Sequence, residues 1–82
     1  MTLDEFISLD HAEKQQIIHN KAEFLGNYYG LSIYIHLYRF NDFYIENCYN
    51  PGCENDQNIS AAEDLLNLPC FVKIKDQGFG LN

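Results

Sequence analysis

Residues 31–49 carry the clearest hydropathy pattern in the chain, LSIYIHLYRFNDFYIENCY. Aliphatic residues occupy every second position and aromatic residues fall between them, which places the two sets on opposite faces of a β-strand. Asn41 and Asp42 interrupt the alternation, and both residue types tolerate the left-handed conformation of a two-residue turn. We therefore predict an antiparallel hairpin with strands Leu31–Phe40 and Phe43–Tyr49.

A turn centred on Asn41–Asp42 determines which residues of the two strands lie opposite one another. Arg39 and Glu46 become diagonal neighbours, and an exposed ion pair between them is worth under about 1 kcal/mol. Both faces are apolar, so each must be covered by another element, by a second copy or by a different protein. One face pairs Phe40 with Phe43, Tyr38 with Ile45, His36 with Asn47 and Tyr34 with Tyr49; the other pairs Arg39 with Tyr44, Leu37 with Glu46 and Ile35 with Cys48.

The N-terminal segment has two helix-start signals. Thr2 and Glu5 have the spacing of a capping box, and they predict a short helix that ends near Leu9. Asp10 and Glu13 repeat that spacing and predict a main helix over His11–Leu25, with apolar residues at helical intervals. Gly26 or Asn27 would end this helix. We expect its apolar stripe to pack on the aliphatic face of the hairpin.

The C-terminal part is polar over residues 50–58, which predicts a loop. Ser60 and Glu63 have capping-box spacing and predict a short helix that ends near Asn67, before Pro69. Phe71–Lys75 alternates again and is typical of an edge strand, while residues 76–82 should fray. The sequence predicts one small α+β domain over residues 1–82: an N-terminal helix on an antiparallel hairpin, then a short helix and an edge strand.

Length and charge limit the function classes. Eighty-two residues allow one core and one functional surface, and a deep catalytic pocket is not expected. The net charge of −7 argues against direct binding to nucleic acid, which requires basic side chains, and favours solubility and encounter with basic partners. The N-terminus lacks a basic region and no apolar run is long enough to span a membrane, so we expect a cytoplasmic protein.

Three cysteines are the first candidates for chemistry. Cys48, Cys53 and Cys70 could form a zinc site with His36, but Cys48 points away from His36 in the predicted register. Cys48 and His19 could be imagined as a catalytic pair, although no thiol-enzyme signature surrounds them. A Cys48–Cys53 disulfide could form under oxidation, whereas a reducing compartment favours free thiols. We expect no catalytic residue, no metal and no other cofactor.

The aromatic face of the hairpin is the candidate functional surface. The short C-terminal helix could cover it through Leu65, Leu66 and Leu68; otherwise it is an interface, because tyrosines are typical hot-spot residues. Acidic residues gather at the hairpin end and in the following loop: Asp42, Glu46, Glu54 and Asp56. The partner-binding candidates are Tyr34, His36, Tyr38, Phe40, Asp42, Phe43, Glu46 and Tyr49.

The run LYRFNDFYIENCYNP resembles a segment of small uncharacterised bacterial proteins in which a helix precedes a hairpin of the LY-x-L-x-x-FYVEV type. The matching residues are Leu37, Tyr38, Phe43, Tyr44, Ile45, Glu46 and Tyr49, while Asn47–Cys48 departs from the usual apolar pair. That resemblance implies a fold and no activity. In size, charge and composition the chain is also similar to phage or mobile-element proteins, including anti-CRISPR inhibitors.

The function expected from these observations is a non-enzymatic protein-binding module, in particular an anti-CRISPR-like inhibitor of a basic nucleic-acid-binding effector. The first alternative is a self-associating, homodimeric structural or accessory protein. The second, with less support, is a small zinc or thiol enzyme.

Overall fold

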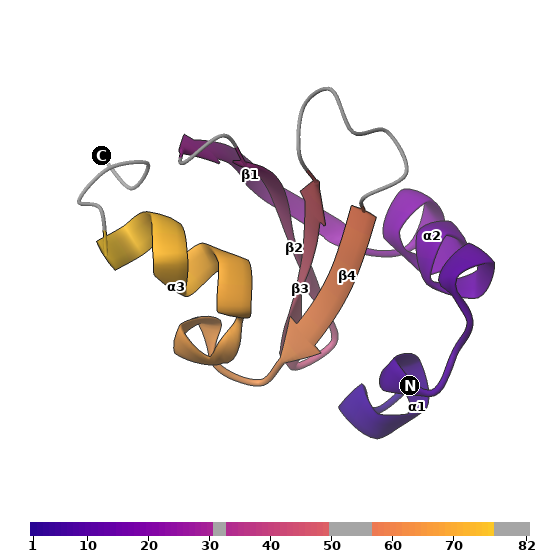
Figure 1. The fold of residues 1–82 in the computed structure, drawn as a ribbon. Coiled ribbons are helices and arrows are strands. Elements are labelled where there is room, and N and C mark those ends of the chain that lie inside the picture. Colours follow the sequence, from indigo (N-terminus) through magenta and orange to yellow (C-terminus); the bar gives the residue numbers. More distant parts are fainter. Residues whose placement is uncertain (31–32, 50–56, 77–82) are drawn as a thin grey trace.

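The computed structural model describes residues 1–30, 33–49 and 57–76, which form an α+β fold. The strands make one antiparallel sheet in the order β1-β2-β3-β4, so each strand pairs with its neighbour in sequence (Figure 1). The predicted fold class is confirmed. In chain order the elements are α1 (Leu3–Ile7), α2 (His11–Asn20), β1 (Glu23–Gly30), β2 (Ile33–Phe40), β3 (Phe43–Tyr49), β4 (Gln57–Ala62), the 3-10 helix η1 (Leu65–Asn67) and α3 (Pro69–Asp76).

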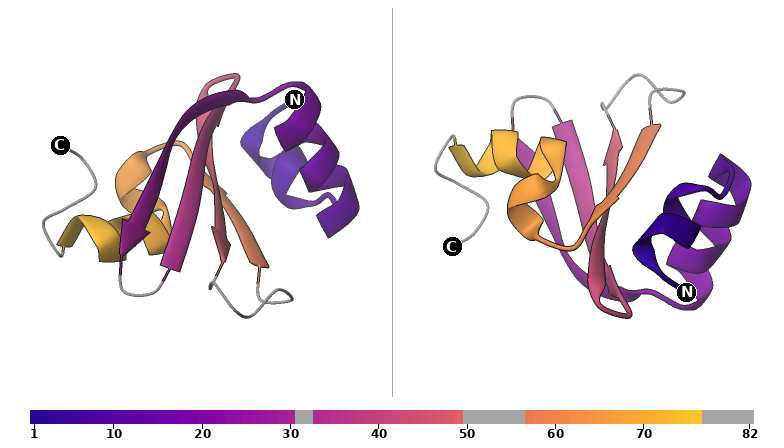
Figure 2. Two further views of the ribbon diagram at one scale, coloured as in Figure 1. Left: turned by 90° about the horizontal axis from the view of Figure 1, so that it is seen from above. Right: turned by 90° about the horizontal axis from the view of Figure 1, so that it is seen from below.

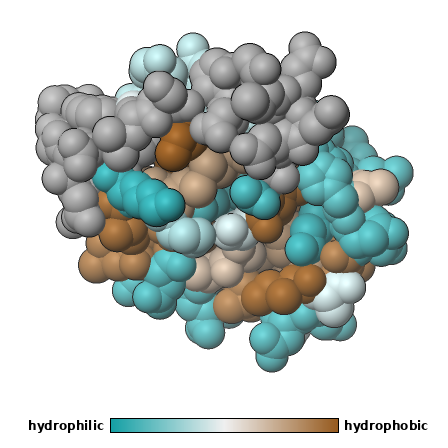
Figure 3. All heavy atoms as spheres, in the orientation of Figure 1, coloured by the Kyte–Doolittle hydropathy of each residue, from teal (hydrophilic) through white to brown (hydrophobic). Residues whose placement is uncertain are grey.

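The sheet is the middle of three layers, with α1 and α2 on one face and η1 and α3 on the other (Figure 2). Phe6 and Ile18 pack on Phe43 and Ile45 to form one core. Leu68 and Phe71 pack on Ile35 and Leu37 to form the other. The polar side of α2 lies outermost, and it contributes the large hydrophilic area at the right of the space-filling view (Figure 3).

The hairpin of β2 and β3 is confirmed together with its register, and the first two residues of the predicted strand Leu31–Phe40 lie outside the described residues. Phe40 pairs with Phe43 next to the turn, and Tyr34 pairs with Tyr49 at the far end. Asn41 has φ of 55°, the left-handed conformation that the Asn-Asp turn predicts. Its side-chain Nδ2 also donates to the Met1 carbonyl oxygen at 2.7 Å, which ties the turn to the N-terminus.

Both N-terminal caps are confirmed. The Thr2 hydroxyl accepts from the backbone N–H of Glu5, whose carboxylate accepts from the Thr2 N–H at 2.8 Å. The Asp10 carboxylate accepts from the Glu13 N–H at 2.8 Å, and Glu13 returns the contact. Each cap satisfies donors that the first helical turn leaves without intrahelical partners.

The predicted main helix is too long. It ends at Asn20 rather than Leu25, and Glu23–Gly30 forms strand β1. This segment contains two glycines, which weaken a helix, and three aromatic residues, which favour a strand. Pairing with the open edge of β2 then decides the outcome, and a bulge between Phe24 and Gly26 adjusts the register.

The predicted helix over residues 60–67 is also wrong. β4 continues through Ser60 to Ala62, because it pairs with the other free edge of the hairpin. The helical turn begins only after Asp64, whose carboxylate accepts from the Leu66 N–H at 2.9 Å. Of the predicted loop over residues 50–58, the last two residues belong to β4. Residues 50–56 lie outside the described residues.

The predicted edge strand Phe71–Lys75 is part of helix α3. The sequence predicts that Pro69 stops a helix, but Pro69 occupies the first position of α3. Proline suits that position because its fixed φ is helical and no partner exists there for the N–H that it lacks. The prediction of a frayed tail falls mainly on residues 77–82, which lie outside the described residues.

The helices also cover the opposite faces from those predicted. The N-terminal helices cover part of the aromatic face, and α3 covers the aliphatic face. Alternation shows which residues share a face, but it does not show which of two apolar helices covers that face. The prediction that the N-terminal helix covers the aliphatic face is therefore wrong, and so is the alternative that the C-terminal helix covers the aromatic face.

Candidate interaction surface on the sheet

The N-terminal helices cover only one half of the aromatic face. The half nearest the Asn41–Asp42 turn is closed by the Phe6 cluster, with the Phe6 and Phe43 ring centroids 5.7 Å apart. The other half lies toward the far end of the hairpin. It carries a group that we call the aromatic patch: Tyr29 from β1, Tyr34 and His36 from β2, Tyr49 from β3, and Phe24 from β1, which lies opposite Tyr38 at the border with the covered half.

The side chains of the aromatic patch form a connected set of ring contacts. Tyr34 links the strands, with its ring centroid 4.6 Å from that of Tyr29 and 5.6 Å from that of Tyr49. His36 lies edge-on to both Tyr49, at 5.4 Å, and Phe24, at 6.4 Å. Rings at these distances and tilts attract one another, so the patch is an ordered surface.

Exposure and hydrogen bonding distinguish the patch from the core. Phe24 is 54% exposed, Tyr29 is 55% exposed and Tyr34 is 37% exposed, whereas His36 and Tyr49 are half-buried. The Tyr49 hydroxyl and His36 Nε2 form a hydrogen bond of 3.1 Å. That bond holds both rings in place, and the Phe24 and Tyr29 rings beside them remain largely open to solvent.

Two basic side chains lie over aromatic rings outside the patch. The Lys14 Nζ lies 5.9 Å from the Phe6 ring centroid, and the Arg39 guanidinium lies 5.7 Å from that of Tyr44 on the opposite face. Aromatic ring faces attract cations because of their quadrupole. The patch itself contains no Lys or Arg, and its most exposed rings are those of Phe24 and Tyr29.

Asn47 lies on the same face of the sheet, opposite His36 on β2 and Ile59 on β4. It is 9% exposed, and its side-chain Oδ1 is buried without a hydrogen-bond partner. A buried acceptor without a donor costs free energy of folding. An apolar residue would suit this position better for stability, so the asparagine beside the patch is a local destabilising feature.

The structure separates the predicted partner-binding residues. Tyr34, His36 and Tyr49 come together in the patch, whereas Tyr38 and Phe40 are half-buried beside the N-terminal helices. Burial raises the pKa of the Tyr38 hydroxyl, so that group stays protonated at neutral pH. Asp42 is exposed in the turn, at the other end of the sheet.

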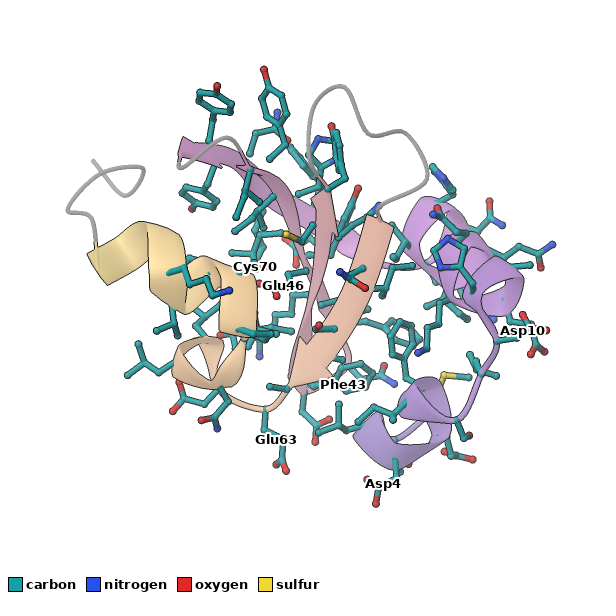
Figure 4. The ribbon with its side chains drawn as sticks, in the orientation of Figure 1. Asp4, Asp10, Phe43, Glu46, Glu63 and Cys70 are labelled. Carbon is teal, nitrogen blue, oxygen red and sulfur yellow. The ribbon has the colours of Figure 1, made fainter. Side chains whose placement is uncertain are left out.

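Phe43 and Glu46 are fully buried, with 0% exposure each, so neither is available to a partner at the surface. Figure 4 shows Phe43 between the sheet and the N-terminal helices, and Glu46 on the α3 side near Cys70. The sequence also missed Phe24 and Tyr29, because it predicts a helix over part of their segment. The paired Tyr28–Tyr29 between two glycines was the available signal for a strand.

Glu46 has a structural role that the sequence did not reveal. Its Oε2 accepts from the Cys70 N–H at 3.0 Å and its Oε1 from the Phe71 N–H at 2.9 Å, so the carboxylate caps the N-terminus of α3 from strand β3. The predicted ion pair with Arg39 is therefore wrong. Burial raises the pKa of the Glu46 carboxyl, while the two N–H donors oppose that shift.

The cysteines and histidines do not converge on one site in the described part of the chain. Cys48 and Cys70 are reduced thiols that contact one another beneath α3, and burial raises the pKa of the Cys70 thiol. His36 lies on the opposite face from Cys48, as predicted, and Cys53 lies outside the described residues. His19 is exposed on α2, which packs on the face away from Cys48, so that pair is not brought together.

No group of three or more His, Cys, Asp or Glu side chains in residues 1–30, 33–49 and 57–76 could hold a metal ion. A hollow beside α1 is lined in part by acidic side chains, Asp4, Asp42 and Glu63, at the opposite end of the sheet from the patch. The helices of the described segments are all too short or too polar to cross a membrane.

The aromatic patch is thus the feature of the described structure that offers an open, ordered and largely uncharged surface. Its side chains provide contact area, π faces and hydroxyl groups, which are the means of recognising another molecule. The chain matches no protein-family model, no curated protein and no solved structure.

Proposed function

We propose that this chain is a non-enzymatic protein-binding module that recognises a basic partner through the aromatic patch. The observation that carries the proposal is the partly covered sheet face, on which Phe24, Tyr29 and Tyr34 remain exposed. Ring contacts through His36 and Tyr49 connect them. Tyrosine-rich surfaces of this kind are typical of binding hot spots, because they supply large area at small entropic cost.

The charge of the chain indicates the kind of partner. A net charge of −7 repels nucleic acid and attracts basic proteins, and the ring faces of the patch attract the same cations. Proteins that hold guide or target nucleic acid have basic channels. We infer that the partner is such an effector and that binding obstructs its handling of nucleic acid.

A capture experiment with matched variants tests the proposal. The immobilised chain is incubated with a lysate of its native host, and bound proteins are identified by mass spectrometry. We expect a nucleic-acid-binding protein that is lost on the double substitution Tyr34→Ala, Tyr49→Ala. Leu66→Ala is the control, because Leu66 is 56% exposed on η1 and lies outside the patch. Binding of the purified partner should weaken as salt rises.

Two results would contradict the proposal. One is a captured protein that binds the double variant and the wild type equally well. The other is a homodimer that forms through the patch, seen by sedimentation as a dimer that Tyr34→Ala converts to a monomer. That result would favour the self-associating alternative instead.

A further inference from the structure

Strand β1 is an outer strand of the sheet, and β2 is its only strand partner among the described residues. It runs for eight residues, from Glu23 to Gly30. Native sheets usually protect such edges with proline, lysine or a short strand, because unpaired backbone groups can pair with another chain. β1 has no proline or lysine, and its one charged residue, Glu23, is at its beginning. Its bulge, another protective device, lies between Phe24 and Gly26 and leaves Asn27 and Tyr29 in regular pairing.

The pairing pattern shows which backbone groups of β1 face outward. Phe40 and Phe43 flank a two-residue turn, so they form a hydrogen-bonded pair. Hydrogen-bonded pairs then recur at every second position along the hairpin. They include His36 with Asn47 and Tyr34 with Tyr49. His36 and Tyr34 therefore direct their N–H and C=O groups to β3, away from β1. Their partners on β1 are Asn27 and Tyr29.

Asn27 and Tyr29 consequently point their own backbone N–H and C=O groups away from β2, toward the outer edge. Both residues are exposed. Tyr29 belongs to the aromatic patch, and its side chain lies on the sheet face next to this edge. The unpaired backbone of β1 and the exposed rings thus form one continuous surface.

We infer that the partner binds as an added β-strand along β1, with arginine or lysine side chains over the rings of the aromatic patch. This inference rests on the proposed function and specifies its geometry. Main-chain hydrogen bonds to Asn27 and Tyr29 would supply affinity, and alternate side chains of the added strand would supply specificity. Cationic side chains complement the charge of −7, whereas a second copy of the chain would bring a like charge.

The test uses a synthetic probe, an acetylated and amidated eight-residue peptide that alternates arginine and valine. Hydrogen exchange by NMR should show that the Asn27 and Tyr29 amides become protected when the peptide binds. Asn27→Pro removes one outward N–H without removing a bond to β2, and it should weaken binding about tenfold. Asn27→Thr retains the N–H and should bind as the wild type does.

Two further peptides probe the backbone of the added strand. One is methylated on the amide nitrogens of all arginines and the other on those of all valines. Because a strand donates to one neighbour from alternate residues, one of the two should lose binding and the other should keep it. A peptide in which glutamate replaces arginine should not bind.

The outcomes separate this inference from the proposed function. If the peptide binds and Tyr34→Ala weakens it, but Asn27 and Tyr29 gain no protection, strand addition is wrong and the patch proposal stands. If the two amides become protected with rising protein concentration alone, a second copy occupies the edge and the inference is wrong. If no peptide binds, the inference is also wrong, and the capture experiment still decides the proposed function independently.

Discussion

At the scale of single residues, the decisive polar contact is the one made by Glu46. A buried carboxylate is unfavourable unless it is compensated, and here the two N–H groups of Cys70 and Phe71 and the helix dipole of α3 compensate it. The pKa of the Glu46 carboxyl is still raised, because the effect of burial is larger than the opposing effect of these contacts. Glu46 thereby connects the middle of the sheet to the helix that closes the second core.

Replacing Glu46 tests that connection. Glu46→Ala should lower the free energy of unfolding by about 2–4 kcal/mol, because it leaves two helix N–H groups without acceptors. Urea denaturation followed by circular dichroism measures this loss. Asp42→Ala, at an exposed turn position, is the control and should change stability by less than about 0.5 kcal/mol. A loss as small as that of the control would contradict the assigned role.

The raised pKa also predicts a pH dependence. A carboxyl whose pKa in the folded state exceeds 4.5, its ordinary value, contributes most to stability below that pH, and this contribution is lost as pH rises through the folded-state pKa. The stability of the wild type relative to Glu46→Gln should therefore fall as the pH rises above 4.5. Denaturation midpoints of both proteins across this range give the slope, and a relative stability that rises with pH would contradict the shift.

Asn47 presents the opposite case, a buried polar group without compensation. Asn47→Leu should raise the free energy of unfolding by about 1 kcal/mol, because it removes an acceptor that has no donor. Thermal and urea denaturation measure the change, and Asn47→Asp, which adds a charge at the same buried position, should destabilise. A leucine variant less stable than the wild type would show that the Oδ1 is satisfied in solution.

At the scale of elements, the helices depend on their caps and the strands on their partners. α2 has only ten residues, so its start must be stabilised locally or by packing. The Asp10–Glu13 capping box stabilises the start locally, and the buried side chain of Ile18 packs the helix on the sheet. β1 and β4 lack comparable local signals and form because each pairs with a free edge of the central hairpin.

Asp10 tests the local contribution. Asp10→Ala should lower the free energy of unfolding by about 1 kcal/mol, because the Glu13 N–H loses its acceptor. Asp10→Asn keeps an acceptor oxygen and should cost much less. Urea denaturation of the two variants side by side measures the difference, and equal losses would show that the side-chain contact does not stabilise α2.

At the scale of the whole molecule, three layers place two cores on either side of one sheet, and neighbouring residues on a strand serve different layers. Ile35 is fully buried under α3, and Tyr34 is 37% exposed in the patch on the opposite face. α3 buries Ile35 and Leu37 on one face, whereas the N-terminal helices cover the other face over only part of its length. The open part of that face carries the surface to which we assign the proposed function.

The two faces of the sheet should respond differently to substitution by a charged residue. Ile35→Asp should unfold the domain, because an unpaired charge in the apolar interior costs on the order of tens of kcal/mol, which exceeds the typical stability of about 5–15 kcal/mol. Tyr34→Asp, one residue away on the patch, should stay folded. Circular dichroism and amide NMR spectra distinguish the two states; a folded Ile35→Asp variant would contradict the layer assignment.

The sequence by itself determined the central hairpin, its register, both N-terminal capping boxes and the α+β class. These follow from short-range signals: period-two alternation, a turn whose residues accept positive φ, and side chains that reach the nearest free N–H groups. It also determined that Tyr34, His36 and Tyr49 share one face. The other two residues of the patch, Phe24 and Tyr29, lie on β1, a strand that the sequence analysis did not predict.

Only the tertiary structure decided the rest. Residues 23–30 and 57–62 are strands because the hairpin offers two free edges, whereas Phe71–Lys75 is helical because Pro69 begins a helix that Glu46 caps from a strand more than twenty residues earlier in the chain. Hydropathy patterns of short segments fit more than one element, and pairing or burial against distant residues selects between them. The same long-range contacts placed Glu46 in the interior and left half of the aromatic face open.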